Sequence, residues 1–147
     1  MAKVEYCALI DGEASRVWDV LKQFGQISKW HPAIPESIIE DGQPDGLVGC
    51  IRRLTLQDGA VLREKLLAVD ETNLLFSYRF LEAPLRVDNY VAIVKLLPLT
   101  GQNKTVVLWS ASFDTRDPDP QGEQTAVIQS LIVGGHESLQ RYLNETA

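Results

Sequence analysis

Short runs of alternating apolar and polar positions fill most of the chain up to about residue 113. Each run is rich in β-branched, aromatic and leucine side chains, and turn signals such as Asp58-Gly59 separate consecutive runs. The strand-like runs cover residues 3–10, 37–40, 50–56, 60–69, 74–81, 89–97 and 105–113. Because consecutive short strands joined by tight turns form antiparallel meanders, we predict an antiparallel sheet of about seven strands.

Helical spacing of apolar residues occurs in two parts of the chain. Residues 16–24 place apolar side chains on one face, and a second short helical segment fits residues 27–30, before Pro32. Residues 121–143 fit one long helix with Gly134 and Gly135 at its middle. This order predicts an α+β helix-grip fold, in which the sheet wraps around a long C-terminal helix and two short helices follow the first strand.

Length and charge narrow the possible partners. The 147 residues suit one domain that spans residues 1–147, and the net charge of −6 argues against nucleic acid or an anionic membrane surface as a partner. No apolar run approaches the roughly 20 residues that a membrane span needs, so we expect no membrane insertion and a cytoplasmic location. Cys7 and Cys50 lie in apolar runs, which is typical of small buried side chains.

Period-two alternation assigns the strand side chains to faces. In residues 60–70 the predicted inner face carries Leu62, Glu64, Leu66 and Ala68. The inner positions of the last two strand-like runs are Tyr90, Ala92, Val94, Leu96, Val107, Trp109, Ala111 and Phe113. Because protein interiors are densely packed, an interior that mixes aromatic rings with alanines is either filled by neighbouring side chains or kept open for a ligand.

Glu64 is the most informative single residue, because a carboxylate on an apolar face is expensive to desolvate. Its pKa should therefore rise, which suits a hydrogen bond to a ligand or general acid–base chemistry. The alternative is a structural ion pair with Arg52 or Arg79 from a neighbouring strand.

The other candidates are hydroxyl and imidazole groups near the expected hollow. Tyr78 and Tyr90 can place hydroxyls on its wall, and His31 belongs to a loop expected at its mouth. The predicted ligand-binding residues are His31, Leu62, Glu64, Leu66, Tyr78, Tyr90, Ala92, Trp109, Ala111, Phe113, Ser130, Gly134 and Ser138. The sequence shows no metal-ligand spacing and no phosphate-binding loop, so we predict neither a metal nor a cofactor.

Several stretches carry a family resemblance: residues 17–25 (VWDVLKQFG), 27–32 (ISKWHP), 49–54 (GCIRRL), 58–59, 64–66, 70, 89–90 and 106–113 (VVLWSASF). With them the chain resembles the polyketide cyclase/dehydrase group of the START-like (SRPBCC) superfamily, which includes the birch-pollen-allergen type and the plant abscisic acid receptors. The resemblance implies a seven-stranded sheet that grips a C-terminal helix around a cavity for lipids, sterols, hormones or aromatic polyketides.

In the receptor branch, the positions that match Glu64 and Tyr90 face the cavity, and the position that matches His31 is a lysine that anchors the ligand. The lid of those receptors corresponds here to the bare hairpin Gln57-Asp58-Gly59, which is too short to close over a ligand. The resemblance therefore implies cavity binding and argues against a hormone-receptor function.

Three functions remain open at this stage. The first is binding of a small hydrophobic molecule, such as a lipid, a polyketide or an aromatic metabolite, in an internal cavity. The second is a cyclase, dehydratase or isomerase that uses Glu64 as its acid or base and Tyr90 or His31 as its electrophilic partner. The third is an interaction domain whose hollow is filled by its own side chains.

Overall fold

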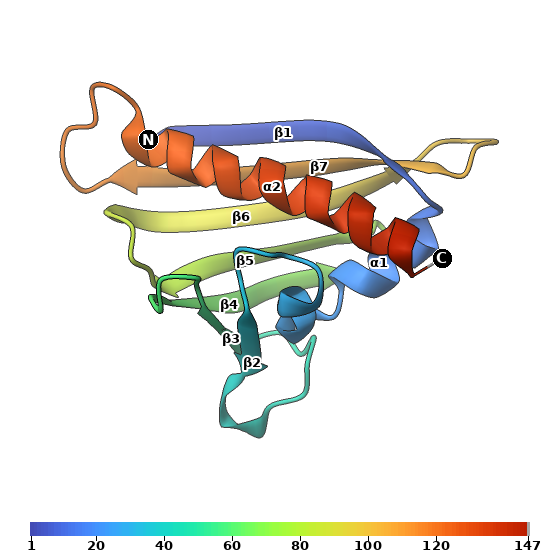
Figure 1. Ribbon diagram of the computed structural model, residues 1–147, viewed down its shortest axis with the longest axis horizontal. Helices are drawn as coiled ribbons and strands as arrows, with labels where there is room; N and C mark the ends of the chain where they lie inside the picture. Colours follow the sequence, from blue (N-terminus) through green and yellow to red (C-terminus); the bar gives the residue numbers. More distant parts are fainter. Residues whose placement is uncertain (147) are drawn as a thin grey trace.

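The structure is a computed structural model that describes residues 1–146, and it confirms the predicted α+β helix-grip architecture (Figure 1). The elements are β1 (Ala2–Asp11), α1 (Ala14–Leu21), the short helix η1 (Phe24–Lys29), β2 (Glu36–Ile39), the helical turn η2 (Glu40–Gly42), β3 (Ile51–Thr55), β4 (Val61–Asp70), β5 (Leu75–Glu82), β6 (Val87–Pro98), β7 (Lys104–Thr115) and α2 (Glu123–Glu145). Among residues 1–146, no helix has both the length and the apolar character needed to cross a bilayer.

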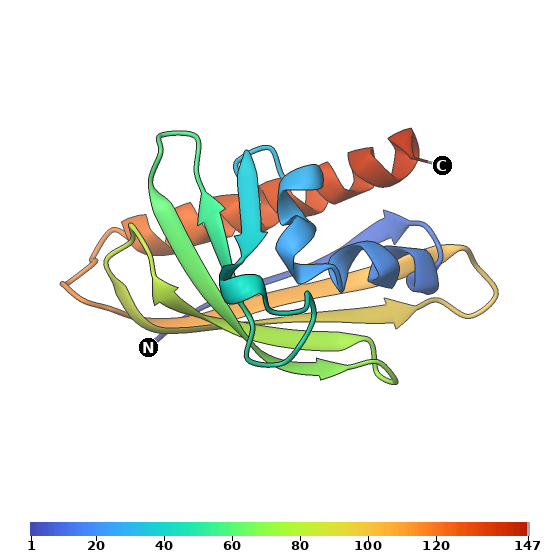
Figure 2. The ribbon, with the colours of Figure 1, turned by 90° about the horizontal axis from the view of Figure 1, so that it is seen from below.

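The strands form one sheet of seven strands in the order β1-β7-β6-β5-β4-β3-β2, and every neighbouring pair is antiparallel. The long helix α2 lies across the inner face of this sheet, while α1 and η1 cover the part that α2 leaves open (Figures 1 and 2). The sheet curves strongly, so that β2 and β3 stand almost across the direction of β7 in the view of Figure 2. A curved sheet over one helix leaves an interior that side chains fill to different degrees along its length.

One end of this interior is tightly filled. Ile10, Val17 and Leu139 have no exposed surface, and Leu143 is 1% exposed. A β-carbon built on Gly12 would lie within 4.0 Å of Ile10, Val17 and Leu143, which shows how closely β1, α1 and the end of α2 approach one another. This closely packed end anchors α2 to the sheet.

Three sequence predictions about faces are wrong. Ala68 is exposed, because the β4–β5 register shifts between Leu66 and Ala68 and turns the rest of the strand over. Ser130 is exposed on α2, since the helix directs its larger aliphatic side chains, such as Ile132, towards the sheet. Cys7 lies on the outer face of β1 and is exposed, whereas Cys50 is buried as predicted.

Candidate functional site

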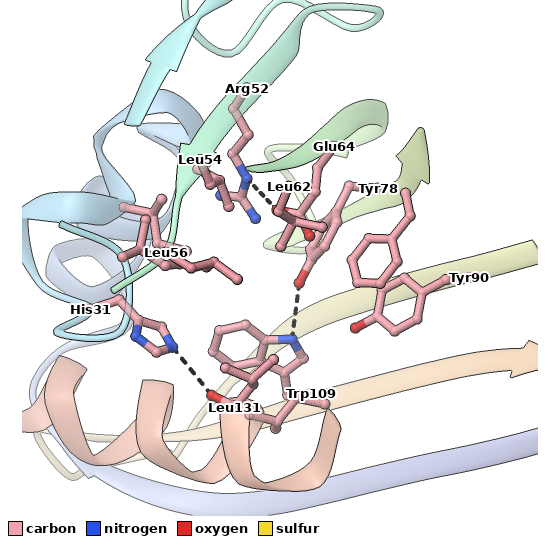
Figure 3. Close-up of a pocket in the computed structure, with 14 residues that line it drawn as sticks. His31, Arg52, Leu54, Leu56, Leu62, Glu64, Tyr78, Tyr90, Trp109 and Leu131 are labelled. Carbon is pink, nitrogen blue, oxygen red and sulfur yellow. Dashed lines mark hydrogen bonds and ion pairs between the residues drawn. The ribbon is translucent and has the colours of Figure 1, made fainter. Parts of the chain in front are cut away.

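A small cavity of about 50 Å³ lies between the inner face of the sheet and the first half of α2. Its walls are mostly apolar, with a few polar groups at one end (Figure 3). The lining residues are Ile27, His31, Ile34, Arg52, Leu54, Leu56, Leu62, Glu64, Tyr78, Phe80, Tyr90, Trp109, Leu131 and Ile132. The hollow is therefore neither filled completely nor large enough, as it stands, for a lipid.

The structure brings together His31, Leu62, Glu64, Tyr78, Tyr90 and Trp109 around this cavity. Leu66, Ala92, Ala111 and Phe113 are buried on the same inner face but lie outside the lining. Ser130 and Gly134 line a shallow depression on the outer side of α2, and Ser138 lies in a separate hollow beside Trp30. Within α2, the hydroxyl of Ser138 donates a hydrogen bond of 2.6 Å to the carbonyl oxygen of Gly134.

Sequence reasoning did not select several lining residues. The sequence indicates Arg52 only as a structural partner of Glu64, although its place directly opposite Glu64 in the β3–β4 pair makes it part of the same wall. Phe80 lies two residues after Tyr78 in β5, on the same face. Leu131 and Ile132 belong to the aliphatic face of α2. The period-two pattern of β5 and the aliphatic spacing of α2 are the signals that could have identified them.

A buried ion pair forms the polar end of the cavity. The Arg52 Nε donates a hydrogen bond of 2.7 Å to Glu64 Oε1, and both side chains are about 95% buried. The Arg52 Nη1 also donates to the carbonyl oxygen of Phe24 at 2.9 Å. The guanidinium carbon lies 3.9 Å from the centre of the Phe24 ring and 4.8 Å from that of Tyr78. These contacts hold Arg52 between two aromatic faces and fix the position of its partner carboxylate.

Burial controls the charge state of this end of the cavity. Loss of water raises the pKa of Glu64, and the Arg52 charge opposes that rise. Burial also raises the pKa of Tyr78 and Tyr90, so both hydroxyls stay neutral across the physiological range. Among residues 1–146, Glu64 Oε1 carries the hydrogen bond to Arg52, while no hydrogen bond is formed to Oε2. The cavity thus contains a carboxylate oxygen with free hydrogen-bonding capacity.

Aromatic rings form the part of the cavity wall next to the ion pair. The Trp109 indole nitrogen donates to the Tyr78 hydroxyl at 3.4 Å, a weak hydrogen bond that joins β7 to β5 across the cavity (Figure 3). The Tyr90 ring lies 6.1 Å from Phe113, and Trp30 lies 6.4 Å from Trp109. Flat apolar surfaces with hydroxyl groups at their edges suit a planar molecule that carries a polar group.

His31 joins the loop after η1 to α2. Its Nε2 lies 3.2 Å from the carbonyl oxygen of Leu131, and its Nδ1 accepts a hydrogen bond of 3.3 Å from the Ala33 backbone. This pattern defines the neutral tautomer with the proton on Nε2, and burial lowers the pKa of His31, which favours the same neutral form. The imidazole has room because residue 135 is a glycine: a β-carbon there would lie 3.2 Å from the ring.

The curved sheet, the long covering helix and the partly polar internal cavity define a START-like helix-grip protein. The chain belongs to the family described as polyketide cyclase/dehydrase and lipid transport, whose model matches residues 1–143. The residues that match the family model include both the closely packed end and the cavity.

Solved structures show the same fold. The protein XoxI from Bacillus cereus is 24% identical and superposes with a TM-score of 0.86, covering 100% of this chain and 99% of its own. A protein from Nitrosospira multiformis is 26% identical with a TM-score of 0.77, covering 94% of this chain and 96% of its own. A protein from Thermobifida fusca is 25% identical with a TM-score of 0.78, covering 97% and 93%, respectively.

Proposed function

We propose that this protein binds a small, largely apolar molecule whose polar group meets Glu64 and Tyr90 inside the cavity. The observation that carries the proposal is the convergence of buried polar groups on a hollow with otherwise apolar walls. Burying ionic groups is unfavourable, and a filled core of apolar side chains would avoid that penalty. The family description, which includes lipid transport, agrees with a ligand of this class.

The charge balance of the cavity favours a neutral polar group on the ligand. The Arg52 guanidinium is already paired with Glu64, so an incoming carboxylate would lose its water without gaining an uncompensated cation. A hydroxyl can donate to Glu64 Oε2, and a carbonyl can accept from the Tyr90 hydroxyl. We therefore expect a ketone, a phenol or an alcohol to bind better than an acid of the same size.

Ligand binding requires side chains to move. Pockets for drug-sized molecules usually measure about 300–1,000 Å³, whereas this cavity measures about 50 Å³. Leu56, Phe80 and Leu131 line the cavity while they keep part of their surface in water. These side chains are the ones that can turn outwards and enlarge the hollow without disturbing the packed end.

A titration with the neutral fluorescent ketone prodan tests the proposal. We expect a blue-shifted emission on binding, and the variant Leu131→Trp, which fills the cavity from α2, should weaken binding at least about tenfold. Val127→Trp is the matched control, since Val127 is 44% exposed on the same helix and does not line the cavity. The anionic dye anilinonaphthalene sulfonate should bind more weakly than prodan. Equal binding to both tryptophan variants would refute cavity binding.

A second function, catalysis, is favoured by the presence of the Glu64 carboxyl group and the Tyr90 hydroxyl in the lining of the same cavity. A carboxylate that removes a proton next to a carbonyl, together with a hydroxyl that stabilises the enolate, is the arrangement a cyclase or isomerase uses. Deuterium exchange into a β-diketone, followed by NMR, distinguishes the two functions. An enzyme should lose most of this exchange in Glu64→Gln while keeping its affinity for the diketone, whereas a binding protein should accelerate no exchange.

A further inference from the structure

The sheet is split between β5 and β6 at the end nearest the cavity. These strands pair from Leu75↔Lys95 to Arg79↔Val91, and the pairing stops there. Beyond that point β5 remains with β4, through the pair Arg63↔Glu82, while β6 remains with β7, through Val87↔Thr115. The backbone of residues 80–82 is therefore not bonded as a ladder to that of residues 87–90, and a gap opens in the wall of the cavity.

A stacked aromatic pair closes this gap. The Phe80 and Tyr90 rings are nearly parallel, with an angle of 7° and a centre-to-centre distance of 3.6 Å. Asn89 adopts a left-handed backbone with φ of 56°, and the β6–β7 register shifts between Asp88 and Val91. Such a bulge redirects the side chain beside it, which here places Tyr90 under Phe80.

The same two rings have a second pocket on their other side. A surface pocket of about 300 Å³ is lined by Phe80 and Tyr90 together with a polar rim that includes Glu82, Asn89 and Arg116. The internal cavity of about 50 Å³ is lined by the same Phe80 and Tyr90. The stacked pair thus lies between a small, mostly apolar chamber and a larger, more polar surface pocket.

The two rings differ in their freedom to move. Tyr90 is 5% exposed, whereas Phe80 keeps part of its ring in water. Phe80 also lies at the end of β5 where no ladder bonds tie that strand to β6, so a change of its side-chain rotamer needs no change in the pairing of the sheet. Turning Phe80 outwards would join the chamber to the surface pocket.

We propose that a ligand enters the cavity through the gap between β5 and β6 and that this gap also forms the outer half of the ligand site. Phe80 is the gating side chain of this entrance. This inference rests on the proposed binding function and adds a ligand class to it. The ligand is an elongated molecule with an apolar body in the inner chamber and a polar outer end at the rim formed by Glu82, Asn89 and Arg116. The inner chamber of about 50 Å³ is too small for such a molecule, and the surface pocket of about 300 Å³ supplies the remaining space.

The competing entrance lies between the β3–β4 hairpin and α2. Leu56 and Leu131 are the partly exposed lining residues on that side of the cavity. The two routes make different predictions for variants that shorten one gating side chain at a time. Phe80→Ala opens the proposed route, and Leu56→Ala opens the competing route. Ala83→Phe narrows the surface pocket outside the gating side chain.

Stopped-flow mixing of prodan with the protein measures the association and dissociation rates directly. We expect Phe80→Ala to raise the association and dissociation rate constants together by about fivefold, the factor that corresponds to losing a stacking contact of about 1 kcal/mol. Ala83→Phe should slow both rates, and Leu56→Ala should raise them by a smaller factor than Phe80→Ala does. Circular dichroism, recorded at the temperature of the stopped-flow measurement, verifies that each variant is folded.

The outcomes separate the entrance from the function. If prodan associates and dissociates faster in Leu56→Ala but not in Phe80→Ala, Phe80 is not the gating side chain, and the binding function remains supported. If prodan binds neither the wild-type protein nor Phe80→Ala, both proposals fail together. A probe that binds with Phe80-dependent rates supports both.

Discussion

The two halves of α2 cover very different interiors. The second half, with Leu139 and Leu143, closes over β1 and α1, where Ile10 and Val17 have no exposed surface. The first half, with Leu131, covers the cavity, where lining side chains remain partly exposed and a buried ion pair replaces apolar packing. The same sheet and the same helix therefore enclose a filled core at one end and an incompletely filled chamber at the other.

This difference shows how one small fold separates stability from binding. Dense packing contributes dispersion and hydrophobic free energy, so the filled end can hold the fold together without help from a ligand. The cavity end contributes less stabilising free energy, because its voids lack contacts and its charges are desolvated. Substitutions at the two ends should consequently change the free energy of unfolding by different amounts.

The largest expected effect is at the ion pair. Arg52→Met leaves Glu64 buried without its partner, and breaking a buried pair in this way destabilises by about 3–5 kcal/mol. The double variant Arg52→Met/Glu64→Leu removes both charges and should recover most of this loss. Urea denaturation followed by circular dichroism measures both. A single variant that is as stable as the double variant would show that the pair is not held in a water-excluded site.

The next effect compares two leucines of α2. Leu139→Ala at the packed end should destabilise by about 3 kcal/mol, since it empties a site that neighbouring side chains cannot easily refill. Leu131→Ala, over the cavity, should cost about 1 kcal/mol, because that side chain is already partly exposed. Thermal unfolding of both variants is the measurement. Equal losses would contradict the contrast between the two ends.

Strand alternation predicts much of this architecture because β6 keeps one register against β7 from Val91 to Pro98. The inner positions Tyr90, Ala92 and Trp109 are all buried, as the alternation indicates. The prediction fails at Ala68, where a bulge in β4 reverses the faces. A bulge depends on how a strand meets its neighbour, and no local pattern in β4 marks it.

The candidate site is only partly predictable for a similar reason. Alternation places Glu64 inside, but the choice between Arg52 and Arg79 as its partner depends on which face of its strand each arginine occupies. Arg79 stands opposite Lys65 on the outer face, and Arg52 stands opposite Glu64. For α2, the spacing of small residues favours Ser130 and Gly134, whereas the aliphatic side chains determine the buried face. The cavity volume depends on packing between distant segments and has no local signal in the sequence.

Substituting either of two adjacent glycines in α2 should change the stability of the protein in opposite directions. A β-carbon on Gly135 would lie 3.2 Å from the His31 ring and 3.4 Å from Trp109, whereas one on Gly134 meets nothing within 4 Å. Gly134→Ala should stabilise by up to about 1 kcal/mol through helix propensity. Gly135→Ala gains the same propensity but overpacks His31, so we expect a net loss of about 1 kcal/mol. Denaturant unfolding of the two variants, measured side by side, gives the sign of each change.

The smallest effect is a pH dependence at His31. Burial lowers its pKa in the folded state, so the unfolded chain binds the proton more readily. The stability that His31 contributes is then fully present above its unfolded-state pKa of about 6.5 and is lost as the pH falls from there towards the folded-state pKa.

Unfolding free energies of the wild-type protein and His31→Gln, compared between pH 7.5 and 5.5, isolate this contribution. The raised pKa of Glu64 acts in the opposite direction and largely cancels in the difference between the two proteins. The control is His136→Gln: burial also lowers the pKa of His136, but that ring packs edge-on against Tyr6, away from the cavity lining. His136→Gln should keep the His31 part of the acid sensitivity. If His31→Gln loses stability in acid as steeply as the wild-type protein, the neutral imidazole is not what joins α2 to the loop after η1.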